Sequence, residues 1–148
     1  MGKSITKNIW SMIVINLAIL ITTLTLHELG HAITGRLAGC VSAKAIIYDS
    51  SSPNPYTELL CEHESKPTYL AGLVFTTIFG LSFLFFDNKP QKMFSLIVIG
   101  FGIFLSALDM VELTQMTAIK YLFIFIGLTS LIIGQVIYGI LNAKETIS

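Results

Sequence analysis

The sequence predicts an all-α fold: a polytopic membrane bundle of about four transmembrane helices, with one longer polar loop after the first helix. Two observations predict it. Hydrophobic residues make up 53% of the 148-residue chain and charged residues only 12%, which is unusual for a soluble domain. The apolar residues also gather in four segments, each long enough to cross a hydrocarbon core of about 30 Å. The formal net charge is zero, so the chain lacks the basic surface that nucleic-acid binding requires.

The four predicted helices fill most of the chain, and we expect one membrane-embedded domain over residues 1–148. The spans must be helical, because an open strand in lipid would leave backbone polar groups unpaired. Lys3 and Lys7 precede the first apolar segment, as in a signal peptide, but no small-residue cleavage site appears before position 27. We therefore expect a retained helix. The helices are predicted at about residues 9–35, 69–86, 93–113 and 121–141.

The longest polar stretch, residues 40–67, separates the first two helices. Within it, Val41–Tyr48 alternates weakly and contains β-branched residues, which favours a short strand or hairpin. Cys40 and Cys61 both lie in this loop. Two cysteines are too few for a disulfide framework, and their spacing is not the C-x-x-C of a metal site. The favoured interpretation is two unpaired thiols, although whether the two cysteines pair is left open.

Small and polar residues recur at helical spacing on the predicted helices. Small residues at such spacing let neighbouring backbones approach closely, so we expect packing surfaces there. They are Gly72, Thr76 and Gly80 on the second helix, and Gly127 and Gly134 on the fourth. Polar side chains on one face of a membrane helix are expected to point into the bundle. Such stripes are Asn16, Thr23 and Thr34 on the first helix, and Ser95, Gly102, Ser106 and Asp109 on the third.

The segment from His27 to His31 reads His-Glu-Leu-Gly-His, an H-E-x-x-H motif. Histidines four residues apart project from the same face of a helix and can bind one zinc ion. Glu28 stands between them, where it can reach water on the metal and act as general base. Two histidines and a glutamate inside a membrane helix are costly, and they are tolerated mainly where they serve a site. The motif therefore predicts a zinc centre within the first helix.

A hydrolytic zinc site needs a third protein ligand and an open position for water. Asp109 is the favoured candidate, since it lies at a similar depth in the third helix as His27 does in the first, and the two helices run in the same direction. A lone carboxylate at such depth needs a partner. His63 in the loop and Glu112 near the end of the third helix remain alternatives.

With these residues in place, the chain resembles the site-2 protease family of intramembrane zinc metalloproteases over the three helices from residue 9 to residue 113. The resemblance implies that His27 and His31 are metal ligands, that Glu28 is the catalytic glutamate, and that Asp109 is the third ligand. The family's aspartate is often followed by glycine, whereas Met110 stands here. Such enzymes cut transmembrane or membrane-adjacent segments of other proteins.

The expected function is therefore hydrolysis of peptide bonds in membrane protein substrates, with Zn²⁺ as cofactor, by an integral multi-pass protein of a prokaryotic cell membrane. Zinc would polarise the substrate carbonyl and acidify water, and Glu28 would move the proton to the leaving amine. A strand in the polar loop would pair with an unwound substrate segment. Two alternatives stay open: a non-hydrolytic protein that binds or transports zinc, and a degenerate protease that binds membrane helices without cutting them. The partners in each case are membrane proteins and the lipid bilayer.

Overall fold

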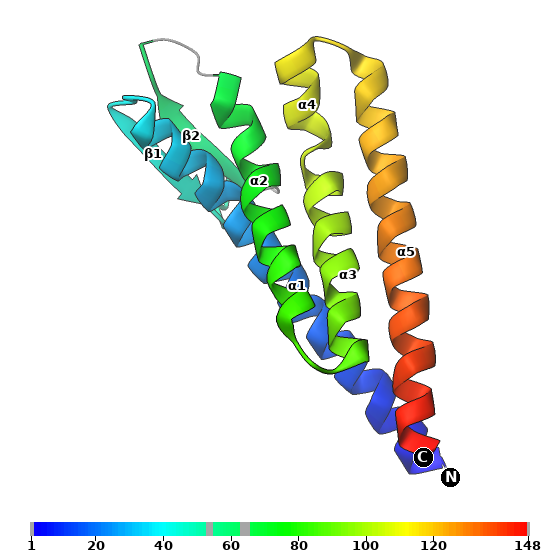
Figure 1. The fold of residues 1–148 in the computed structure, drawn as a ribbon. Helices are drawn as coiled ribbons and strands as arrows, with labels where there is room; N and C mark the ends of the chain where they lie inside the picture. Colours follow the sequence, from blue (N-terminus) through cyan, green and yellow to red (C-terminus); the bar gives the residue numbers. More distant parts are fainter. Residues whose placement is uncertain (1, 53–54, 63–65, 148) are drawn as a thin grey trace.

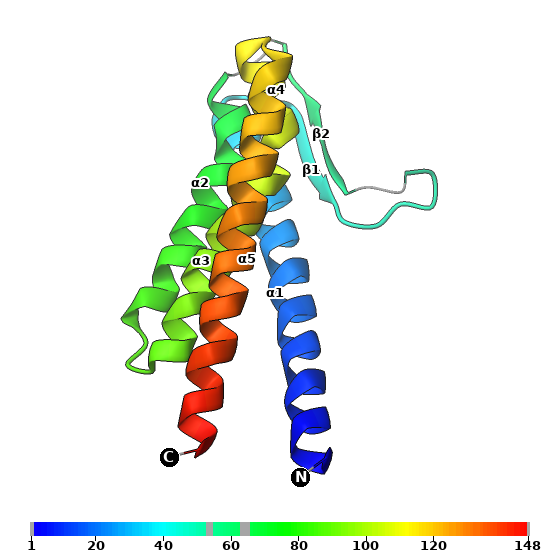
Figure 2. The same ribbon diagram turned by 90° about the vertical axis from the view of Figure 1, so that its right-hand side faces the viewer.

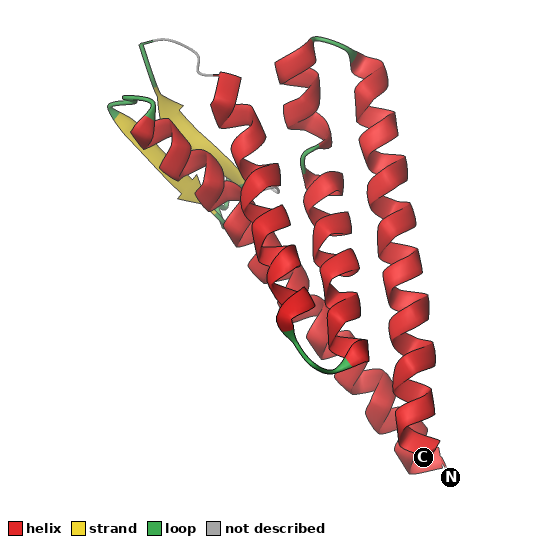
Figure 3. Ribbon diagram, in the orientation of Figure 1, coloured by secondary structure: helices red, strands yellow, loops and turns green. Residues whose placement is uncertain are grey.

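The computed structural model describes residues 2–52, 55–62 and 66–147, with side chains for 10–52, 55–62 and 66–144. Helices dominate it, and they lie side by side in an elongated bundle with both termini at one end (Figure 1). A small β-hairpin lies beside α1 at the other end (Figure 3). In chain order the elements are α1 (Gly2–Leu37), β1 (Ser42–Ile46), β2 (Tyr56–Leu60), α2 (Lys66–Ser82), the 3₁₀ turn η1 (Phe83–Phe85), α3 (Lys89–Leu105), α4 (Ala107–Thr114) and α5 (Thr117–Ile147).

The helices agree with a membrane protein. Among the described residues, three stretches are long and apolar enough to cross a membrane: Trp10–Leu37, Lys66–Phe85 and Thr117–Lys144. The pair α3 and α4 counts as a fourth span if the two are taken together. The predicted helical membrane architecture is therefore confirmed at this level, and the hairpin adds a two-stranded sheet that a purely helical class does not contain.

The third predicted helix is not continuous, because α3 and α4 meet at Ser106 with a bend of 46°. The Ser106 hydroxyl donates to the carbonyl of Gly102 at 2.8 Å, the same oxygen that accepts the Ser106 amide at 3.0 Å. A serine that bonds back onto the preceding turn competes with the helical ladder and bends the helix. The bend turns α4 away from the axis of α3 (Figure 1), and Asp109 lies in the first turn of α4.

Two hydrogen-bonded strands replace much of the predicted loop. β1 falls inside the predicted strand region, and it pairs antiparallel with β2, which is not predicted from the sequence. The Val41 amide donates to the carbonyl of Leu60 at 2.9 Å, so the pairing runs on to the adjacent cysteines. Cys40 and Cys61 form a disulfide, and the interpretation as two unpaired thiols is wrong. The 21-residue separation between them carries no sign of this contact, which arises only from the hairpin register.

The turn of the hairpin is organised around Asp49. The amide and hydroxyl of Ser51 donate to its carboxylate at 3.0 and 2.7 Å, and the Tyr56 hydroxyl donates at 3.0 Å. Hydrogen bonds from the Ser51 backbone and side chain, and then from Tyr56, lower the pKa of the Asp49 carboxyl below its ordinary value. The same bond to Asp49 raises the pKa of the Tyr56 hydroxyl.

Close helix packing occurs at the small residues, as predicted. α3 packs most extensively against α5, and a methyl group added at Gly127 would lie 2.8 Å from the Phe104 amide nitrogen. A methyl group at Gly134 would lie 2.9 Å from Ile97, which is fully buried. The predicted polar stripes also face inward, since Thr23 and Ser106 have no exposed surface.

The first helix leans across the bundle and touches α5 through long polar side chains. In Figure 2, α1 and α5 run apart toward the ends of the chain. Asn16 and Gln135 bridge them, with the Asn16 amide donating to Gln135 Oε1 at 3.3 Å and the Gln135 amide donating back to Asn16. Each amide satisfies the other, which lowers the cost of two polar side chains within the apolar region.

Candidate metal centre

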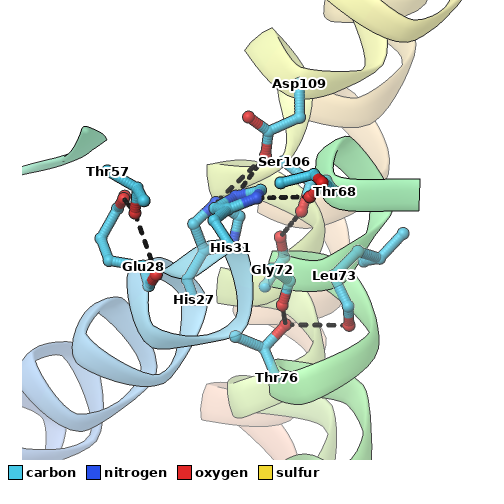
Figure 4. A network of polar contacts seen from close by, with 11 residues as sticks. His27, Glu28, His31, Thr57, Thr68, Gly72, Leu73, Thr76, Ser106 and Asp109 are labelled. Atoms are coloured by element: carbon cyan, nitrogen blue, oxygen red, sulfur yellow. Dashed lines mark hydrogen bonds and ion pairs between the residues drawn. The ribbon is translucent and has the colours of Figure 1, made fainter. Parts of the chain in front are cut away.

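The motif histidines lie in the last third of α1, on the face toward α2 and α4 (Figure 4). Their side chains are buried, with 3% of His27 and 7% of His31 exposed. Nε2 of His27 and Nε2 of His31 are 3.2 Å apart. This is the arrangement that a four-residue spacing gives when both rings point to one position beside the helix.

Asp109 reaches the same position from α4. Its Oδ2 lies 3.1 Å from His27 Nε2 and 3.3 Å from His31 Nε2. The carboxylate is brought there by the bend at Ser106, three residues earlier, which directs the first turn of α4 over the histidines. Of the two candidate third ligands that the structure describes, Asp109 and Glu112, Asp109 is therefore the one that lies at the histidines.

Glu112, the other candidate that the structure describes, does not join this group. Glu112 is three residues further along α4, is exposed, and is not among the described residues that could share one metal ion. His63 lies outside the described residues. In the part of the chain that the structure describes, the possible metal ligands gathered at one point are His27, His31 and Asp109.

The three atoms form a nearly equilateral triangle with sides of 3.1, 3.2 and 3.3 Å. Ligand atoms about 2.0 Å from a tetrahedral cation lie roughly 3.3 Å from one another. Imidazole and carboxylate groups suit zinc and neighbouring divalent metals. The spacing and the donor set therefore fit a small divalent cation bound by three protein ligands.

Polar atoms around the triangle agree with such a cation. His31 Nδ1 lies 2.6 Å from the carbonyl of Thr68, and because a carbonyl only accepts, Nδ1 donates its hydrogen there and the lone pair of a neutral ring is on Nε2. Histidines that bind metals commonly donate their second ring N–H to a backbone carbonyl in this way. Asp109 Oδ2 and His27 Nδ1 are buried without a hydrogen-bond partner. A cation would satisfy the carboxylate oxygen.

Room for the two rings comes from Gly72 on α2. A methyl group there would lie 2.5 Å from His27 Nδ1 and 2.7 Å from His31 Nε2, and it would also overlap His27 Cε1. One turn later, the buried Thr76 hydroxyl donates to the carbonyl of Gly72 at 2.9 Å. The glycine predicted as a packing residue therefore packs against the histidines themselves.

Glu28 occupies a different face of α1, toward the hairpin (Figure 4). It is 8% exposed, and the hydroxyl of Thr57 on β2 lies 2.7 Å from its Oε2 and 2.9 Å from its backbone carbonyl, so that the single hydroxyl hydrogen is shared between the two acceptors, the carboxylate being the nearer. A cavity of about 800 Å³ opens beside Glu28 and the three possible ligands. Glu28 and the candidate metal position therefore line the same cavity.

The cavity walls come from both sides of the bundle. Residues of α1, β2 and the start of α2 line it, together with residues from the end of α3, from α4 and from the start of α5. Most of the lining is apolar, with Lys120 on α5 adding a positive charge. The lining residues outside the metal position include Leu24, Tyr56, Leu59, Phe104, Leu108 and Ile124.

Three contributors to the site are not predicted from the sequence. Thr57 lies in a strand that the sequence pattern does not reveal, and Lys120 reads as a residue of a short linker. Thr68 contributes its backbone carbonyl, which any residue type provides. A buried glutamate such as Glu28 needs a hydrogen-bond donor, which in principle points to a donor nearby. The loop contains many residues that could be this donor, so the sequence does not single out Thr57.

Comparison with protein-family models, with curated proteins and with solved structures found no match.

Proposed function

We propose that this chain is an intramembrane zinc metallopeptidase that hydrolyses peptide bonds in or near transmembrane segments of other proteins. The observation that carries the proposal is the triangle of His27 Nε2, His31 Nε2 and Asp109 Oδ2 beside a cavity that also holds Glu28. Three ligands leave a fourth position for water or substrate, as in catalytic zinc sites. The resemblance of the motif to site-2 proteases agrees with this chemistry.

Zinc, when bound, would supply a Lewis acid that polarises a carbonyl group and makes water a stronger acid. The protein's own contribution begins with His31, whose ring is fixed by the Thr68 carbonyl. Glu28 would be the general base. Its Oε2 accepts the Thr57 hydrogen bond, which leaves Oε1 to take a proton and deliver it to the amine that departs.

The substrate proposed is an extended segment of a membrane protein. The cavity lies among helices that can span the bilayer, and its lining is largely apolar. β2 lines that cavity and pairs with β1 along one edge. Its other edge would bind an unwound segment through backbone hydrogen bonds, which demand no particular side-chain sequence. The location proposed is the cell membrane of a prokaryote.

Replacing Glu28 separates this proposal from non-hydrolytic alternatives. Glu28→Gln should keep about one zinc per chain and lose at least about 100-fold in cleavage of a membrane-embedded test substrate, because general base catalysis contributes at least that much. Glu58→Gln is the matched control, since Glu58 is an exposed glutamate on β2. Zinc transport or binding of helices without cleavage would survive Glu28→Gln, and a fully active Glu28→Gln protein would refute the proposed base.

A further inference from the structure

β2 runs along the face of α1 that carries Glu28 and Gly35. These two residues are seven apart, or about two turns, and share a helical face. Thr57 and Leu59 are two apart in β2 and share a face of the strand. The burial of β2 alternates accordingly, with both of these side chains half-buried. One side of the strand therefore rests against one side of the helix.

Two contacts fix the strand on the helix. At one end, the Thr57 hydroxyl shares its hydrogen between the Glu28 carboxylate and backbone carbonyl. At the other end, Leu59 sits directly on Gly35, where an added methyl group would lie 2.6 Å from Leu59 Cδ2. The disulfide from Cys61 to Cys40 joins the end of β2 to the chain that leaves α1. The strand is thus held at a defined position along the helix.

We propose that Thr57 is a positioning residue for Glu28: its hydroxyl, held in place by the docked hairpin, fixes the buried carboxylate in the orientation that catalysis requires. The inference rests on the proposed function of Glu28 as general base. It assigns the hairpin a part in the chemistry as well as in substrate binding, because the strand that lines the cavity also holds the base.

The physical argument concerns the freedom of the glutamate. A glutamate side chain has three rotatable bonds, and its placement in one rotamer costs conformational entropy. A hydrogen bond from a rigid neighbour to a carboxylate is among the stronger ones in proteins. Because Thr57 binds both the backbone and the side chain of Glu28, it fixes the carboxylate relative to the same turn that carries the histidines.

The test uses zinc-loaded full-length protein and three variants. Thr57→Val keeps the shape and removes the hydroxyl, whereas Thr57→Ser keeps the hydroxyl. Thr25→Val is the matched control, because the Thr25 hydroxyl donates only to the Ile21 carbonyl of its own helix among the bonds described. Thr57→Val should lower kcat about tenfold or more while KM and zinc content stay near the wild-type values, as loss of a hydrogen bond to a charged group predicts. Thr57→Ser should restore most of kcat.

Hydrogen exchange supplies a readout that does not depend on cleavage. Amide exchange of β2 is measured in wild type, Thr57→Val, Glu28→Ala and the double variant. Added to the wild-type protein, Thr57→Val should speed exchange of the β2 amides about tenfold. Added to the Glu28→Ala variant, it should speed exchange clearly less, because Glu28→Ala has already removed the bond to the carboxylate. Equal effects in both backgrounds would overturn the proposed contact.

The outcomes distinguish the two proposals. Glu28-dependent cleavage that is as fast in Thr57→Val as in Thr25→Val would overturn the positioning role and leave the peptidase intact. Coupled exchange in a protein that cleaves nothing would support the contact between Thr57 and Glu28 and overturn the proposed peptidase. A loss of kcat in Thr57→Val that Thr57→Ser does not restore would also overturn the inference, since the hydroxyl would then not be the group that matters.

Discussion

Replacement of Gly72 by alanine is expected to remove zinc without touching a ligand. The new methyl group would lie 2.5 Å from His27 Nδ1 and 2.7 Å from His31 Nε2, where ordinary contact begins near 3.4 Å. The rings would have to retreat by about 0.7 to 0.9 Å, whereas metal sites tolerate deviations of only about 0.2 Å in ligand distance. The His31 ring has little freedom to do so, because Nδ1 is bonded to the Thr68 carbonyl.

The expected loss of zinc affinity in Gly72→Ala is about 100-fold, the upper end of the loss that changes to the surroundings of metal ligands cause. Overpacking should also cost about 1 to 3 kcal/mol of stability. The assay is elemental analysis of detergent-purified protein after dialysis against buffered zinc, with circular dichroism to confirm the fold. Gly139→Ala is the control, since nothing lies within 4 Å of a methyl group there. Equal zinc content in Gly72→Ala, Gly139→Ala and wild type would refute the proposed packing of the two histidine rings against Gly72.

Three further predictions concern the third ligand, the disulfide and the hairpin turn. Asp109→Ala should lower zinc affinity at least about 100-fold by removing a ligand, whereas Glu112→Ala should leave it unchanged; metal titration of both variants decides this, and the reverse order would contradict the site. Because disulfides persist in oxidising compartments, the Cys40–Cys61 pair predicts that the hairpin end of the bundle faces away from the cytoplasm. Protease protection of a tag inserted in the hairpin turn checks this orientation. A tag located on the cytoplasmic side would contradict it. The lowered pKa of Asp49 predicts that its hydrogen bonds stabilise the turn fully above pH about 3.8, and that this stabilisation is lost as the pH falls through the folded-state pKa. Hydrogen exchange of the turn amides should show this loss on acidification. An Asp49→Asn variant should not show it.

The parts of the site that the sequence predicts are those set by short-range geometry. Residues four apart on a helix share a face whatever surrounds them, so His27 and His31 are expected together. The cost of a carboxylate among apolar side chains made Asp109 the favoured partner, and the structure brings it to the histidines. Apolar length predicts where the helices lie but not their ends, since α1 (Gly2–Leu37) and α5 (Thr117–Ile147) both extend beyond the predicted 9–35 and 121–141, and the predicted helix 93–113 is divided into α3 and α4.

What the sequence does not predict depends on contacts between distant segments. The bend at Ser106 does not follow from the residue type alone, because Thr23 and Thr76 bond back onto the preceding turn in the same way within the continuous helices α1 and α2. Strand β2 has no strong alternating pattern, and its register alone brings Cys40 to Cys61. Thr57 is one of several hydroxyl residues in the loop, and only the docked hairpin selects it as the donor to Glu28.

The most direct measurement of the central claim, that His27, His31 and Asp109 hold zinc beside Glu28, is X-ray absorption at the zinc edge together with metal content per chain. We predict about one zinc per chain, with two imidazole nitrogens and a carboxylate oxygen at roughly 2.0 to 2.2 Å. His27→Ala and His31→Ala should each abolish this signal. A protein that takes up no zinc, or one whose zinc content and ligand shell are unchanged in both histidine variants, would contradict the claim.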